Sequence, residues 1–216
     1  MTPLTELIIK SSDQHRVLSS KQLERLLGGS DARRYGMVNR ALKSGELLKV
    51  RRGLYVLSRD NRETSVQPFA LAQQVIPGSY VSVETALSFH GWIPEAVHVI
   101  ASFTNGGKTI EFSHDILGQF TFRSISAHSG YFLQAVTRHE LHQQVALVAE
   151  PMRALIDLVY LRKLPWQGLA YLLDGLRVDE QLLRSVPISE IKKLLDVYKG
   201  KREKVFIEEL LRALSL

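Results

Sequence analysis

The 216-residue chain contains no cysteine. This absence excludes a disulfide framework, a thiolate zinc site and catalysis by a cysteine nucleophile. It fits a reducing compartment, and we expect a cytoplasmic protein. No run of 18 consecutive apolar residues occurs, so no membrane-spanning helix is expected. The first residues, MTPLTELIIK, lack the basic segment and the long apolar stretch of a secretory signal.

Net positive charge is missing from most of the chain. Residues 1–62 carry 13 Lys and Arg against 6 Asp and Glu, a net charge of +7, whereas residues 63–216 carry 15 against 16, a net charge of −1. Apolar residues make up 45% of the chain, which is ordinary for a folded globular protein. The asymmetry predicts a polyanion-binding domain, residues 1–60, joined to a nearly neutral domain, residues 63–216.

The first domain has the element order of a winged helix-turn-helix. Serine caps and glycine stops delimit three helices, and two short β-type runs follow. The expected elements are helices within residues 2–10, 19–28 and 30–45, and strands over residues 47–50 and 54–57. The Gly28-Gly29 pair makes the turn between the second and third helices tight.

The third helix divides into two faces at 100° per residue. We expect its buried face to consist of Tyr35, Val38, Ala41 and Leu42. The opposite face carries Arg33, Gly36, Arg40 and Lys43, with Asn39 at its margin. This division suits a helix in the major groove of DNA, because long cationic side chains reach phosphates while Arg and Asn reach base edges.

A cluster of cations also surrounds the turn between the two strands, which would form the wing. The predicted DNA-contacting residues of helix and wing together are Arg33, Arg34, Asn39, Arg40, Lys43, Lys49, Arg51 and Arg52. Two alternatives stay open for this pattern: an ordinary solvated helix face, and a winged helix that binds protein. Charge asymmetry, helix order and the basic wing all favour DNA.

The remaining residues predict a second domain of mixed type, so the whole chain is assigned to the α+β class. Strands are expected mainly between residues 80 and 133, and helices between residues 150 and 214. Three strands are expected at 97–103, 108–112 and 119–125, with a short fourth at 131–133, and the run 80–83 leads into a helix. Asn105-Gly106-Gly107 predicts a hairpin between 97–103 and 108–112. The expected helices are 68–75, 84–90, one from Glu150, 166–173, 180–184, 188–198 and 201–214.

Three stretches in this order, LLKVRRGLYVL, YVSVETALSFHGWIPE and AEPMRALIDLVYLRK, resemble the AbiEi family of type IV antitoxins. That family joins an N-terminal winged helix to a larger antitoxin domain. The resemblance implies a transcriptional autorepressor that binds repeats in its own promoter, with double-stranded DNA as its partner. It also implies a cognate nucleotidyltransferase toxin, which the antitoxin counteracts, often without stable contact. The family provides no catalytic role for any residue of the matching stretches.

No catalytic residue, metal site or cofactor is predicted. His139 and His142 stand three apart on an expected helix, a spacing that can chelate a metal, but no third ligand accompanies them. Glu111, His114 and Asp115 cluster near a strand end and raise a nuclease interpretation. A solvated turn explains that cluster more simply, because nothing in the sequence holds its carboxylates in a fixed geometry.

A catalytic triad is not expected either. Ser82, Glu84 and His90 are almost contiguous and lack a nucleophile elbow. We therefore expect no enzyme. The last helix has an apolar stripe that packs either on its own domain or, in the alternative, in a homodimer; its residues are Val205, Phe206, Leu210, Leu211 and Leu214. A second alternative keeps DNA binding and makes the larger domain a sensor of a small ligand.

Overall fold

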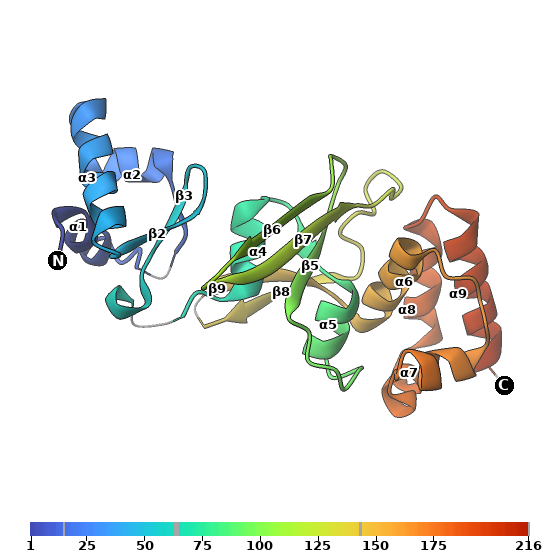
Figure 1. The fold of residues 1–216 in the computed structure, drawn as a ribbon. Helices are drawn as coiled ribbons and strands as arrows, with labels where there is room; N and C mark the ends of the chain where they lie inside the picture. Colours follow the sequence, from blue (N-terminus) through green and yellow to red (C-terminus); the bar gives the residue numbers. More distant parts are fainter. Residues whose placement is uncertain (15, 63–64, 143, 216) are drawn as a thin grey trace.

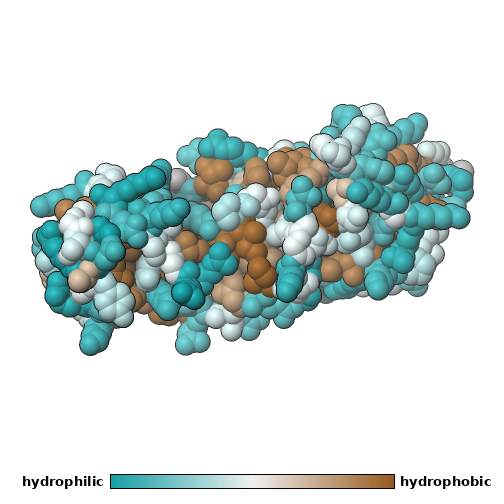
Figure 2. Space-filling model, turned by 90° about the horizontal axis from the view of Figure 1, so that it is seen from above, coloured by the Kyte–Doolittle hydropathy of each residue, from teal (hydrophilic) through white to brown (hydrophobic). Residues whose placement is uncertain are grey.

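The computed structural model describes residues 1–14, 16–62, 65–142 and 144–215. The molecule is elongated: the first domain lies at one end, a β-sheet occupies the middle, and the last helices lie at the other end (Figure 1). Hydrophilic side chains cover both ends, and hydrophobic ones gather over the middle of the face shown in Figure 2. None of the described helices is long and apolar enough to cross a membrane.

The first domain is the predicted winged helix-turn-helix. Its elements are α1 (Pro3–Lys10), β1 (Leu18–Ser19), α2 (Ser20–Leu27), α3 (Asp31–Lys43), β2 (Leu47–Arg51) and β3 (Leu54–Leu57). The strands form an antiparallel sheet in the order β1-β3-β2. The sequence pattern did not predict β1, because two residues are too few to show alternation.

Local chemistry delimits the helix-turn-helix. Ser19 and Gln22 form a capping box at the start of α2, in which the Ser19 hydroxyl accepts from the Gln22 amide and the Gln22 side chain accepts from the Ser19 amide. Gly28 and Gly29 follow with φ of 57° and 72°, a conformation that other residues rarely adopt. The Ser30 hydroxyl then caps α3. The turn between the helices is therefore only a few residues long.

Helix α3 is rotated relative to the sequence prediction. Met37 and Ala41 are buried in the first domain, with 6% and 0% of their surface exposed, and Val38 and Leu42 pack at the edge of the same core. The prediction that Tyr35 is buried is wrong, since 72% of its surface is exposed. At 100° per residue it lies about 160° around the helix from Met37. The buried stripe is centred on Met37 and Ala41 instead.

The second domain contains a six-stranded mixed sheet in the order β6-β7-β5-β4-β9-β8. Its strands are β4 (Tyr80–Val81), β5 (Val99–Thr104), β6 (Ile110–His114), β7 (Gly118–Ser124), β8 (Val136–Leu141) and β9 (Gln144–Ala149). β5 pairs with β7 and β4 with β9 in parallel, and the other neighbours are antiparallel. Helices α4 (Pro68–Val75) and α5 (Val83–Phe89) alternate with these strands, and α4 packs against β4, β5 and β9.

Several strand predictions were wrong. Asn105-Gly106-Gly107 does not make a hairpin, because β7 lies between β5 and β6; the hairpin joins β6 to β7 instead. Residues 131–133 lie outside any strand. His139 and His142 are not on a helix: His139 is in β8, and His142 follows β8 in the turn toward β9. The sheet therefore extends to Ala149, beyond the expected range.

The helical part begins after β9, as predicted. Its elements are α6 (Pro151–Arg162), a π-helical turn (Tyr171–Gly175), α7 (Glu180–Ser185), α8 (Ile188–Lys193), a 3-10 turn (Leu194–Asp196) and α9 (Lys201–Leu214). Phe206, Ile207 and Leu210 of α9 are buried in the core of the same domain. Most of the apolar stripe thus has an intramolecular partner. Val205 is 40% exposed and does not belong to this core.

A charged network lies at the buried centre of the second domain. Arg153 and Asp157 of α6 are 0% exposed, and Nε of Arg153 lies 2.9 Å from Oδ1 of Asp157. Three hydroxyl groups donate to the same carboxylate: those of Tyr80 at 2.9 Å, Ser82 at 2.6 Å and Tyr198 at 2.7 Å. The buried charge is thus paired and hydrogen-bonded on several sides, as a charge in a protein interior must be.

The same network joins two of the three stretches singled out in the sequence. Tyr80 and Ser82 belong to the stretch YVSVETALSFHGWIPE, and Arg153 and Asp157 belong to AEPMRALIDLVYLRK. A surface ion pair between Glu84 and Arg162 joins the two stretches again, and α5 packs against α6. These two stretches therefore hold β4, α5 and α6 together.

Candidate nucleic-acid interface

Helix α3 presents cations at the end of the molecule farthest from the C-terminal helices (Figure 1). Arg33, Arg40 and Lys43 are exposed, and Asn39 is half-buried. Among the described residues, none of the three cations has a carboxylate within ion-pair distance. Unpaired cations on a convex helix leave their charge available to an external anion, which is what binding to DNA phosphates requires.

Two guanidinium groups lie over glycines. A Cβ placed on Gly36 would stand 3.9 Å from Nη1 of Arg40, and one placed on Gly29 would stand 3.1 Å from Nη1 of Arg33. The Arg40 guanidinium therefore extends back along α3 over Gly36, and that of Arg33 reaches back over the glycine turn before the helix. Because Gly36 has no side chain, the backbone of α3 is accessible in the middle of its exposed face.

Arg34 differs from the other predicted contacts. It forms an ion pair with Asp31, and its Nη1 donates to the carbonyl of Gly29 at 2.5 Å. Its side chain is 24% exposed. These contacts tie the first turn of α3 to the preceding glycine turn, so Arg34 stabilises the start of the helix. Its contact with DNA stays a prediction.

The wing is short and fixed at its tip. Arg52 and Gly53 form the turn between β2 and β3, and Gly53 has a φ of 80°, which suits glycine. The backbone amide of Ser20, at the start of α2, donates to the carbonyl of Gly53 at 2.9 Å. Lys49, Arg51 and Arg52 are all exposed. The wing cations are therefore held beside the N-terminus of α2.

Arg51 also borders a groove between the two domains. This groove, of about 760 Å³, is lined by Arg16 and Arg51 from the first domain and by Gln74, Pro77 and Gln144 from the second, among others. Beside it, the backbone amide of Val17 donates to Oε1 of Gln74 at 2.9 Å. The winged helix is thus held against the second domain by a direct hydrogen bond.

Comparison with known families bears on this domain. Residues 6–58 match the family described as "Transcriptional regulator, AbiEi antitoxin". The AbiEi resemblance is confirmed over these residues, which include the stretch LLKVRRGLYVL. The match covers the helix-turn-helix and the wing and ends before the second domain. No curated protein matches the chain.

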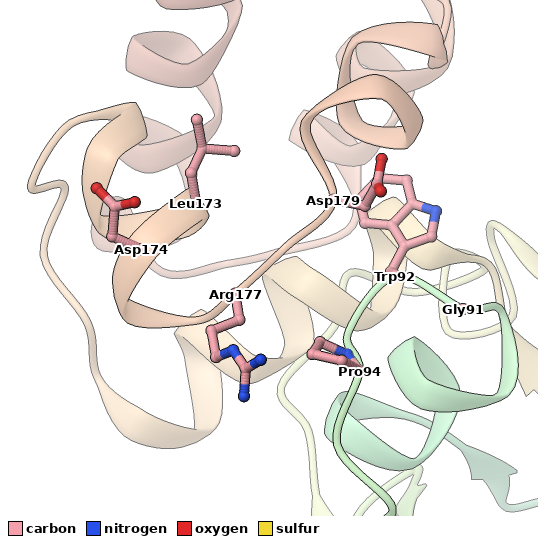
Figure 3. Close-up of a pocket in the computed structure, with 7 residues that line it drawn as sticks. All are labelled: Gly91, Trp92, Pro94, Leu173, Asp174, Arg177 and Asp179. Carbon is pink, nitrogen blue, oxygen red and sulfur yellow. The ribbon is translucent and has the colours of Figure 1, made fainter.

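Outside the matched segment, one pocket of about 510 Å³ lies between the loop after α5 and the segment that follows the π-helical turn. Trp92 and Arg177 line it, together with Asp174 and Asp179. Figure 3 shows these two carboxylates on opposite sides of the pocket, and Asp179 is occupied in capping α7. Arg177 forms an ion pair with Glu95 at 2.8 Å. The carboxylates therefore do not converge on one metal position.

The residues considered for metal or nuclease chemistry also lie in separate contacts. Glu111 forms an ion pair with Arg123 at 2.5 Å. Nδ1 of His114 accepts a hydrogen bond from the amide of Ile116 at 3.2 Å. In the described part of the chain, no group of three or more His, Cys, Asp and Glu side chains could hold a metal ion.

A histidine pair was missed by sequence analysis. The rings of His90 and His139 have centroids 5.7 Å apart, and Phe89 packs edge-on against both. Nε2 of His90 lies 3.0 Å from the carbonyl oxygen of Ala149. Burial lowers the pKa of His90, and the nearby His139 lowers it further, against the opposite effects of the Ala149 hydrogen bond and of Glu150. No local pattern announces a contact between residues 49 positions apart.

The three residues weighed as a triad are not brought together. Ser82 donates to Asp157, Glu84 pairs with Arg162, and His90 contacts Ala149. Each of these side chains is thus engaged in holding the second domain together. The exposed cations of the first domain remain the candidate functional site.

Proposed function

We propose that this chain is a DNA-binding antitoxin that represses its own operon and acts by binding, not by catalysis. The observation that carries the proposal is the exposed face of α3, where Arg33, Arg40 and Lys43 lack acidic partners among the described residues. This face lies within the segment that matches AbiEi antitoxin regulators. The proposed target is repeated sequence in the promoter of the operon.

The binding has a physical signature. Cations that neutralise phosphates release counterions, so affinity falls as salt concentration rises, with a slope of about −0.9 per phosphate contact. Arg40 on α3 and Arg51 on the wing belong to different elements of the domain. Each is expected to contribute separately to affinity and to the salt slope.

The test measures binding of the full chain to promoter DNA over a range of salt concentrations. Arg40→Ala and Arg51→Ala are each expected to weaken binding about tenfold, the effect of losing one charge-assisted hydrogen bond. Each should also reduce the salt slope by about 0.9. Arg184→Ala in α7, another exposed arginine, is the matched control and should bind like wild type. Unchanged affinity and slope in both test variants would exclude this face as the DNA site.

We also propose that the same chain neutralises a nucleotidyltransferase toxin. We propose that neutralisation does not depend on the DNA-binding cations, because the second domain carries a net charge of −1 and lies outside the matched regulator segment. Co-expression of the toxin with the Arg40→Ala chain should therefore still rescue growth, although the variant no longer represses the promoter. Loss of rescue in a variant that folds normally contradicts this separation.

A second candidate function is favoured by the interdomain groove. Its volume of about 760 Å³ is in the range of small-molecule sites, and it touches both the wing and the second domain. In such a regulator, a ligand bound in the groove would contact Arg51 and so change the affinity for DNA. Thermal-shift screening of anionic metabolites separates the candidates, because a specific ligand raises the melting temperature by mass action. An antitoxin without an effector shows no such ligand.

A further inference from the structure

Tyr35 is an apolar exception on the exposed surface of α3. Its side chain is 72% exposed. Among the described residues of α3, no other large hydrophobic side chain is exposed. No hydrogen bond of its hydroxyl to another described residue is present, and its ring stacks on no other described aromatic ring. Folding therefore does not explain why an aromatic residue stands here.

The position of Tyr35 places it beside the polar residues of the same face. Asn39 follows four residues later, so the two side chains are neighbours on the helix surface. On its other side, Tyr35 borders a groove of about 310 Å³ between α2 and α3, whose walls include Leu23, Val38 and Tyr55. The groove is also lined by Glu24, Asp31 and Arg34, so the ring lies between the cationic face and a groove of mixed polarity.

The major groove of DNA has one apolar group on its base edges, the C5 methyl of thymine. Arginine, lysine and asparagine gain little from that methyl, because they act through charge and hydrogen bonds. A phenol ring offers a flat apolar surface that a methyl group can contact. We propose that the ring of Tyr35 packs against a thymine methyl and makes Tyr35 a specificity-determining residue of this interface.

This inference rests on the proposed DNA binding and adds sequence discrimination to it. The cations of α3 and the wing bind phosphates, which are the same in every sequence. Tyr35 would supply a contact that depends on the base. A contact through its hydroxyl to a phosphate would instead strengthen binding to all sequences equally, and the two roles respond differently to removal of the methyl groups.

The test begins by selecting a preferred site from a random duplex library with the full wild-type chain. Each thymine of that site is then replaced in turn by deoxyuridine, which removes only the methyl. At one position or more the wild-type chain should lose about fourfold in affinity, the effect of exposing one buried methyl. Tyr35→Phe keeps the ring and should keep this loss. Tyr35→Ala should bind the two duplexes equally.

Tyr131→Ala, which alters another exposed tyrosine in the second domain, is the control and should behave like wild type. Circular dichroism confirms that each variant is folded. The inference is overturned if Tyr35→Ala retains the methyl dependence, if Tyr35→Phe loses it, or if selection yields no preferred sequence although salt-dependent binding persists. Absence of any DNA binding by the wild-type chain overturns the proposed function as well, so the two failures are distinguishable.

Discussion

Gly36 lies in the middle of α3, where glycine lowers helix stability. Replacing it with alanine is expected to raise the free energy of unfolding by up to about 1 kcal/mol. The added Cβ meets Nη1 of Arg40 at 3.9 Å, an ordinary contact, so the fold has room for it. Urea denaturation measures the gain. The same variant should bind promoter DNA more weakly, because the methyl stands on the surface proposed to face DNA; unchanged DNA affinity would show that Gly36 makes no close approach to it.

His90 predicts a pH dependence of stability. Its pKa lies below the ordinary value of 6.5 in the folded protein, chiefly because the ring is buried. As pH falls below that ordinary value, the unfolded chain takes up a proton before the folded chain does, so stability decreases toward the lower folded pKa. His90→Gln should show a smaller loss of melting temperature than wild type between about pH 7.5 and about pH 5.5. Parallel curves for the two proteins contradict this assignment.

At the residue scale, sequence located the cations of α3 and the wing but misplaced one aromatic side chain. The arcs centred on Val38 and on Met37 with Ala41 overlap, and both are largely apolar. The position of α1 and the sheet decides which arc is buried, and helical periodicity contains no information about that position. Tyr35 belongs to the arc centred on Val38 and not to the arc centred on Met37 and Ala41. The error concerned a residue of the candidate interface itself.

At the scale of elements, the buried Arg153–Asp157 pair links α6 to β4 and to Tyr198. Asp157→Ala should lower the free energy of unfolding by about 3–5 kcal/mol, because it leaves the Arg153 guanidinium buried without its counterion. Three hydroxyl groups, those of Tyr80, Ser82 and Tyr198, lose their acceptor at the same time. Urea denaturation of the full chain measures the change.

A double variant makes the cause testable. Arg153→Met combined with Asp157→Leu removes both charges and should recover much of the stability lost in Asp157→Ala, since buried apolar residues often replace a buried ion pair without loss. A double variant that is no more stable than Asp157→Ala would show that lost packing, and not the uncompensated charge, dominates.

The elements that sequence predicted well are those with local determinants. Pro68 opens α4, and the predicted bounds of α4 and α9 match the structure. The sheet was predicted less well, because its order depends on contacts between distant segments. β7 lies between β5 and β6. β8 and β9 form the other side of the sheet, where the sequence pattern around His139 had indicated a helix. A turn sequence such as Asn105-Gly106-Gly107 reverses the chain without specifying the neighbouring strand.

At the scale of the whole molecule, the winged helix has a core of its own but is not independent of the second domain. Leu4, Ile8 and Leu23 belong to that core. Val17, directly before β1, and Val50 of β2 belong instead to the hydrophobic cluster of the second domain. The winged helix therefore presents cations at one end of the molecule and an apolar contact toward the other domain.

This contact predicts the behaviour of residues 1–62 released as a fragment. Separation exposes Val17, Val50 and Val56, each of which contributes at most about 2 kcal/mol through burial. The fragment should therefore melt at a lower temperature than the full chain and tend to self-associate, as followed by circular dichroism and light scattering. Val17→Thr with Val50→Thr in the fragment should reduce self-association. A fragment as stable and monomeric as the full chain would mean that the interdomain contact contributes nothing to folding, and that Arg51 is positioned by the wing alone.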